Sequence, residues 1–125
     1  MAAVLIATIT LIGAAVALMN IMLVSVTERT KEIGIRKAIG AKSKLVMNQF
    51  VIEAITICQL GGIGGIILGL IIGNATSNYI GGSFIVPWNW MILAVVVCSV
   101  VGLLAGIWPA YKASKVDPII ALRYE

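Results

Sequence analysis

The sequence has no histidine, only two cysteines and only five carboxylates among its 125 residues. Four of those carboxylates lie within or beside clusters of lysine and arginine, so acid–base catalysis and metal binding have few residues to use. Cys58 and Cys98 both lie in apolar stretches, where a thiol behaves as a small hydrophobe, and a disulfide framework is not expected. We therefore predict no catalytic or metal centre in this chain, no bound cofactor and no nucleic-acid partner.

Charge is also scarce, and it is absent from two long stretches, residues 1–27 and 54–111. Charged residues make up 11% of the chain and hydrophobic residues 61%, with a mean hydropathy of +1.10. Soluble domains carry roughly 25% charged residues, and a chain of this size buries only about two-thirds of its surface on folding. These values exclude a water-soluble globule, and lipid must cover the remaining apolar surface.

The two uncharged stretches predict an all-α membrane protein with three transmembrane helices, at about residues 3–25, 50–73 and 90–108. Each span is close to the roughly 20 residues that cross a bilayer. Basic residues gather between the first two spans and after the third, which places both clusters in the cytoplasm. Residues 74–89 then form an outer loop and Met1 lies outside. A first segment with this pattern is a poor signal peptide, so we expect a further span and an external domain before it.

Small residues recur every four positions in the second and third spans. Such stripes allow close helix packing in lipid. The stripes indicate either packing between the two spans or a seam with a second copy, and intramolecular packing is the favoured alternative. The predicted packing residues are Gly61, Gly65, Gly69, Gly73, Cys98, Gly102 and Gly106.

The segment between the first two spans, ERTKEIGIRKAIGA from residue 28 to 41, fits an amphipathic helix at the membrane surface. Arg29, Glu32 and Arg36 share one face, while Ile35 and Ile39 lie on another. We expect Gly40 to break the helix and Ser43 to cap the next one. Composition alone favours a role in topology and in contact with lipid head groups.

The carboxyl-terminal tail, residues 111–125, repeats this pattern. Pro109 is expected to end or kink the third span, and Asp117 followed by proline predicts the start of a short helix. An apolar edge of that helix would either lie on the bilayer or dock on a protein. The residues of this surface are Asp117, Ile119, Ile120, Leu122 and Arg123.

The run SVTERTKEIGIRKAIGAKSKLVMNQFVIEA, from Ser25 to Ala54, resembles the stretch after the second transmembrane helix of FtsX-like permeases of the macrolide-exporter (MacB-like) type. The ending GIWPAYKASKVDPIIALRYE resembles the carboxyl terminus of the same family. The resemblance implies a permease of the bacterial inner membrane with four transmembrane helices, of which this chain supplies the last three. It also implies an external domain and a separate or fused ATPase, which binds ATP and Mg²⁺. A permease homodimer, a periplasmic adaptor and an outer-membrane channel are further implied partners.

In such permeases the segment that corresponds to residues 28–44 is a coupling helix resting on the ATPase, with the tail nearby. The mechanism implied is mechanotransmission, in which ATP binding moves the coupling helices and the spans relay the motion outward. Lipoprotein release and activation of cell-wall hydrolases are alternatives within the superfamily, and a small self-associating scaffold or pore is an alternative outside it. The implied coupling residues are Glu28, Arg29, Glu32, Ile35, Arg36, Lys37 and Ile39.

Overall fold

The computed structural model describes residues 1–84, 86–117, 119 and 121, and these residues form four helices. The helices are α1 (Ala2–Glu28), α2 (Thr30–Ala38), α3 (Ser43–Tyr79) and α4 (Trp88–Ser114). Three of the helices, α1, α3 and α4, are long and apolar enough to cross a membrane. The predicted all-helical fold with three candidate spans is therefore confirmed for the described residues.

The three long helices run past the borders that the sequence predicted. Helix α3 has 37 residues, about 55 Å at 1.5 Å per residue, which exceeds the hydrocarbon thickness of about 30 Å. Helix α4 continues through Pro109 to Ser114, so of the two expected effects of that proline the end of the helix is excluded, while a kink stays a prediction. Membrane helices tolerate proline because neighbouring groups can satisfy the freed backbone carbonyl, and Pro109 is fully buried against the rest of the chain.

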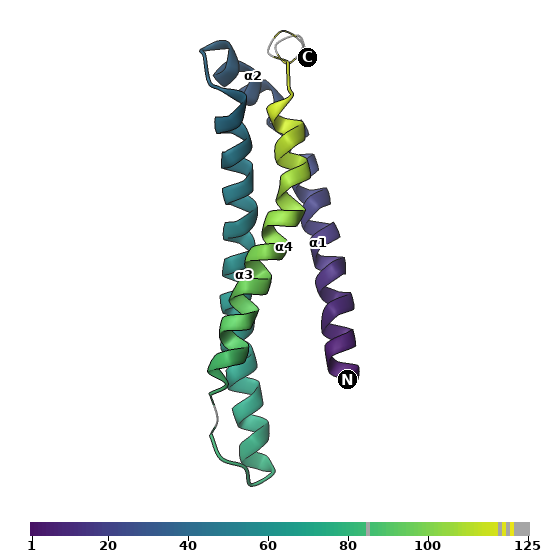
Figure 1. Cartoon of the computed structure of the whole chain (residues 1–125), viewed down its shortest axis with the longest axis vertical. Helices are drawn as coiled ribbons and strands as arrows, with labels where there is room; N and C mark the ends of the chain where they lie inside the picture. Colours follow the sequence, from purple (N-terminus) through teal and green to yellow (C-terminus); the bar gives the residue numbers. More distant parts are fainter. Residues whose placement is uncertain (85, 118, 120, 122–125) are drawn as a thin grey trace.

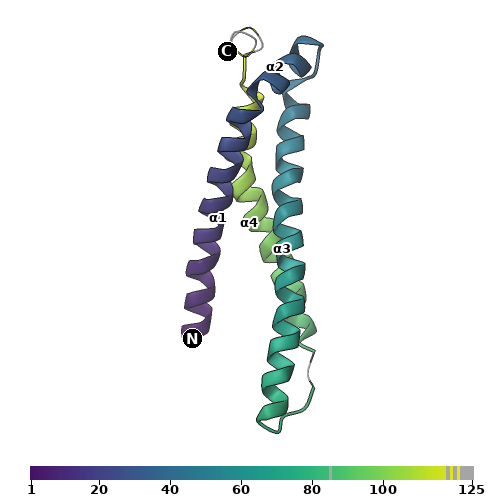
Figure 2. The same cartoon turned by 180° about the vertical axis from the view of Figure 1, so that it is seen from behind.

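Helices α3 and α4 form an antiparallel hairpin, and α1 packs on α4 (Figure 1). Both views show α1 diverging from α3 toward the amino terminus (Figure 2). We call the end of the bundle that holds α2 and the last turns of α4 the α2 end. The opposite end, with the turn between α3 and α4, is called the distal end.

Three pairs of small residues lie at the seam between α3 and α4. A Cβ atom added to Gly106 would lie 2.5 Å from the Cβ of Ala54, and one added to Gly102 would lie 3.0 Å from the Cβ of Cys58. One added to Gly62 would lie 2.8 Å from the Sγ of Cys98. On each helix these residues are four positions apart and therefore lie on one face. Because all of them are small, the two backbones can approach this closely.

The predicted stripe of α4, Cys98, Gly102 and Gly106, therefore lies at the seam, but its predicted partner on α3 was wrong. Among the described residues, nothing lies within 4 Å of a Cβ placed on any of the four predicted glycines of α3, and all four are exposed. The α3 residues that contact α4 at the seam are Ala54, Cys58 and Gly62. These glycines of α3 lie outside the seam: Gly61, Gly65, Gly69 and Gly73.

Glycine ends both α2 and α3 in the same way. Gly40 has φ +108° and Gly81 has φ +80°, a conformation that favours glycine because it has no Cβ. After α2, the backbone N–H of Ala41 donates to the carbonyl of Arg36 at 3.0 Å, as in a Schellman motif. The predicted break at Gly40 is confirmed. The predicted cap at Ser43 was wrong, because Ser43 is the first residue of α3 and makes no capping side-chain bond.

The buried core lies at the α2 end, where all four helices meet. The remaining length of the bundle exposes large apolar side chains, as expected for a surface that faces lipid. The core cluster consists of Met22, Val26, Ile33, Val46, Phe50, Ala54, Ala110 and Ala113.

Candidate functional site

The α2 end is built from a short helix laid across the ends of longer ones. Helix α1 ends at Glu28, and Arg29, with φ −93° and ψ 11°, forms the junction with α2. The predicted single amphipathic helix is therefore divided into the last turn of α1, a junction and the nine residues of α2. The division lets α2 change direction, so that one of its faces packs onto the bundle and the opposite face stays exposed.

Ile33 anchors α2 to the bundle. Its side chain is 3% exposed and belongs to the core cluster, and the adjacent Gly34 is also buried. Ile33 was not predicted from the sequence, where the apolar pair Ile35 and Ile39 is the more conspicuous feature of this helix. Burying an isoleucine side chain contributes about 1.5–3 kcal/mol, so Ile33 is the main apolar attachment of α2.

Lys37 fastens α2 to the end of α4. Its Nζ donates hydrogen bonds to the carbonyl oxygens of Ser114, at 2.5 Å, and Val116, at 2.9 Å. These carbonyls lie at and just beyond the carboxyl end of α4, where helix carbonyls lack partners and the helix dipole favours a positive charge. Lys37 is half-buried. Its ammonium group therefore stabilises the α2 end through contacts within the chain.

Two further polar contacts join the α2 region to α3. The Nη1 of Arg36 donates to the Oε1 of Gln49 at 2.9 Å. Arg29 and Glu53 form a salt bridge at 3.9 Å between side chains that are partly exposed, and such pairs contribute about 0–1 kcal/mol. Helix α2 is thus attached to α3 and α4 by polar contacts as well as by Ile33.

The outer face of α2 carries exposed apolar side chains. Ile35 is 43% exposed and Ile39 is 82% exposed, and the charged Glu28 and Glu32 are exposed nearby. A surface with apolar side chains surrounded by charges suits docking of a protein better than binding of a small molecule. In the described residues, no three His, Cys, Asp or Glu side chains come together as a metal site.

The start of the tail has the local geometry that the sequence predicted. The Oδ1 of Asp117 accepts a hydrogen bond from the backbone N–H of Ile119 at 2.9 Å, and the Asp117 carbonyl accepts one from Ala121 at 2.9 Å. Ile119 is exposed, whereas Ala121 is buried. Asp117 directly follows Val116, whose carbonyl accepts a hydrogen bond from Lys37, so this start of the tail lies at the α2 end. The other predicted tail residues, Ile120, Leu122 and Arg123, lie outside the described residues.

These features define a multi-pass α-helical membrane protein with a helical hairpin and a small helix fastened across one end. Residues 4–118 match the family model described as FtsX-like permease C-terminal. The chain belongs to the FtsX-like permease family.

Several curated relatives carry the name macrolide export ATP-binding/permease protein MacB. The protein of Mannheimia succiniciproducens is 50% identical over 96% of this chain and 19% of its own length. Those of Bdellovibrio bacteriovorus and Vibrio parahaemolyticus are 48% and 50% identical, over 96% and 94% of this chain and 18% of their own lengths. The chain thus spans about a fifth of the length of these relatives and corresponds to a MacB-like permease region.

Proposed function

We propose that this chain is the transmembrane permease part of a MacB-like ABC transporter of the bacterial inner membrane, and that it transmits ATP-driven motion outward for export. ATP and Mg²⁺ bind to the ATPase, and the chain itself performs no hydrolysis. Its membership of the FtsX-like permease family and the names of its relatives support this proposal. A permease homodimer, a periplasmic adaptor and an outer-membrane channel complete the proposed assembly.

The observation that carries the proposal is the attachment of α2 to the bundle. Ile33 is buried among residues of α1, α3 and α4, and Lys37 binds the end of α4. Closely packed interiors have low compressibility and pass displacement on to their neighbours. A push on α2 from the cytoplasm would therefore move the ends of all three long helices together.

The exposed face of α2 is the proposed docking surface for the ATPase. In this proposal Ile35 and Ile39 insert into an apolar groove of the ATPase, while Glu28, Arg29 and Glu32 lie at its rim. Asp117 and Ile119 of the tail extend the same surface. Losing the contacts of both isoleucines should cost roughly 2 to 5 kcal/mol in binding, which is a large loss of affinity.

The double variant Ile35→Ala with Ile39→Ala in the complete protein tests this proposal. Because both side chains are exposed, the spans should fold normally, but stimulation of ATP hydrolysis and export should be lost. Ile80→Ala is the matched control, since Ile80 is 82% exposed, like Ile39, and lies at the distal end. Normal stimulation by the double variant would show that α2 is not the coupling surface.

A further inference from the structure

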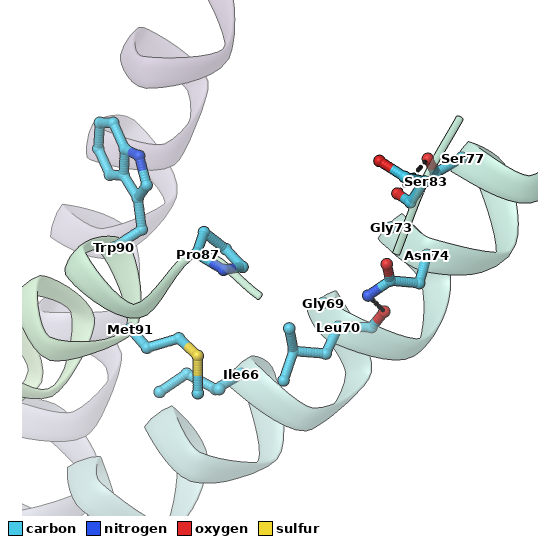
Figure 3. Close-up of a pocket in the computed structure, with 10 residues that line it drawn as sticks. All are labelled: Ile66, Gly69, Leu70, Gly73, Asn74, Ser77, Ser83, Pro87, Trp90 and Met91. Carbon is cyan, nitrogen blue, oxygen red and sulfur yellow. Dashed lines mark hydrogen bonds between the residues drawn. The ribbon is translucent and has the colours of Figure 1, made fainter. Parts of the chain in front are cut away.

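A groove of about 390 Å³ opens at the distal end, between α3 and the start of α4. We call it the distal groove. Its walls include Ile66 and Leu70 of α3, and Met91 and Trp90 of α4 (Figure 3). Ligand sites are typically concave and mostly apolar, with a few polar groups at defined positions. The distal groove has this character and lies far from the coupling surface proposed above.

The length of the distal groove corresponds to one leaflet of a membrane. Its lining on α3 extends from Ile66 to Ser77, a stretch of twelve residues whose ends lie about 16 Å apart along the helix. The hydrocarbon core of a bilayer is about 30 Å thick, so the groove covers about half of it. One helical turn beyond Ile66, the contact between Gly62 and Cys98 closes the space between the helices. A packed transmembrane helix would instead need a surface that crosses both leaflets.

The polarity of the distal groove changes along its length. The deep end is apolar, and Figure 3 shows the side chain of Met91 reaching toward Ile66. At the shallow end, Asn74 Nδ2 donates to the carbonyl of Leu70 at 3.0 Å, and Ser77 Oγ donates to the carbonyl of Ser83 at 3.2 Å. This order, apolar toward the membrane centre and polar toward its surface, matches an acyl chain that is linked to a glycerol ester.

Two glycines keep the distal groove open. Gly69 and Gly73 line it, and nothing in the described residues lies within 4 Å of a Cβ at either position. Neither glycine has a positive φ, so the backbone does not require glycine there. Glycine within a helix costs about 1 kcal/mol relative to alanine. Their effect in this structure is to leave space along the wall of the groove.

We propose that the distal groove binds one acyl chain of a phospholipid from the leaflet opposite α2, with its ester group beside Asn74 and Ser77. The chain lies along Gly69 and Gly73 and ends near Ile66 and Met91. The bound lipid fills the groove between the two arms of the hairpin.

Photolabelling tests the proposal in the complete protein, reconstituted in vesicles with a phosphatidylethanolamine that carries a diazirine along one acyl chain. Bulk lipid should label residues according to exposure, and thus Leu68, which is 60% exposed, more than the half-buried Leu70. A bound chain should instead label Leu70 and Met91 more strongly than Leu68. Labelling that follows exposure would overturn the proposal.

Filling the groove provides a second test. Gly69→Leu should reduce the labelling of Met91 about tenfold, the change expected when two methylene groups of the lipid lose their burial. Gly65→Leu is the matched control, since Gly65 is equally open but does not line the groove, and its labelling should be unchanged. Equal labelling in both variants would contradict the proposal.

Efficient disulfide formation between two copies carrying Gly69→Cys would also contradict the proposal, because protein would then cover the groove.

Discussion

The ammonium group of Lys37 lies 2.9 Å from the carbonyl oxygen of Val116, which follows the end of α4. This contact joins residues that are 79 positions apart in the sequence. It connects the proposed coupling helix to the helix that forms the hairpin with α3. A displacement of α2 therefore reaches α4 through a charged hydrogen bond as well as through the apolar core.

Replacing Lys37 with methionine should destabilise the α2 end. Hydrogen bonds to charged groups contribute about 1.5–3 kcal/mol each, and partial exposure reduces this value, so we expect a loss of about 1–3 kcal/mol. Thermal unfolding in detergent measures the effect. Lys31→Met is the control, since Lys31 is an exposed lysine of the same helix. Equal midpoints for the two variants would show that the Lys37 contacts add no stability.

Replacing Gly106 with leucine should separate α3 from α4. Even a Cβ at this position would lie 2.5 Å from that of Ala54, and overpacking of this kind costs about 1–3 kcal/mol or more. Gly65→Leu should leave the midpoint of thermal unfolding nearly unchanged, because a Cβ at Gly65 meets no described residue within 4 Å. If Gly65→Leu proves the more damaging of the two, the seam lies on the other face of α3.

The sequence was sufficient to predict the three long helices, since each contains an uncharged apolar stretch of about the length that a bilayer requires. It also predicted the α4 side of the seam. It failed on the α3 side, because Ala54 and Cys58 are small without being glycine, while a Cβ on any glycine of the more conspicuous stripe would meet no described residue of α4 within 4 Å. Which small residues meet depends on how two helices are rotated against each other, and spacing within one helix does not define that rotation.

The candidate site was predicted in part for a similar reason. The pattern of α2 identified Ile35 and Ile39 as an apolar pair, and the structure leaves both exposed. It did not identify Ile33 as the anchor or Lys37 as an internal contact, because their partners come from α3, α4 and the residues that follow α4. Contacts between distant segments become visible only when the fold is known.

The orientation of the chain can be tested by cysteine labelling in intact cells. Lysine and arginine cluster at the α2 end, so this end should be cytoplasmic. With Cys58 and Cys98 replaced by alanine, a membrane-impermeant maleimide should label Ser83→Cys directly. Lys42→Cys should react only after the membrane is permeabilised. The reverse pattern would place α2 outside and would exclude a cytoplasmic ATPase as its partner.

The most direct test of the central claim is photocrosslinking from Ile39 in the complete transporter. A photoreactive phenylalanine analogue at this exposed position should crosslink to the ATP-binding part, and mass spectrometry should locate the crosslink in an apolar groove. The same analogue at Ile80, equally exposed at the distal end, should give no such product. Crosslinks from Ile39 to lipid alone, with none to the ATP-binding part in any nucleotide state, would contradict the account.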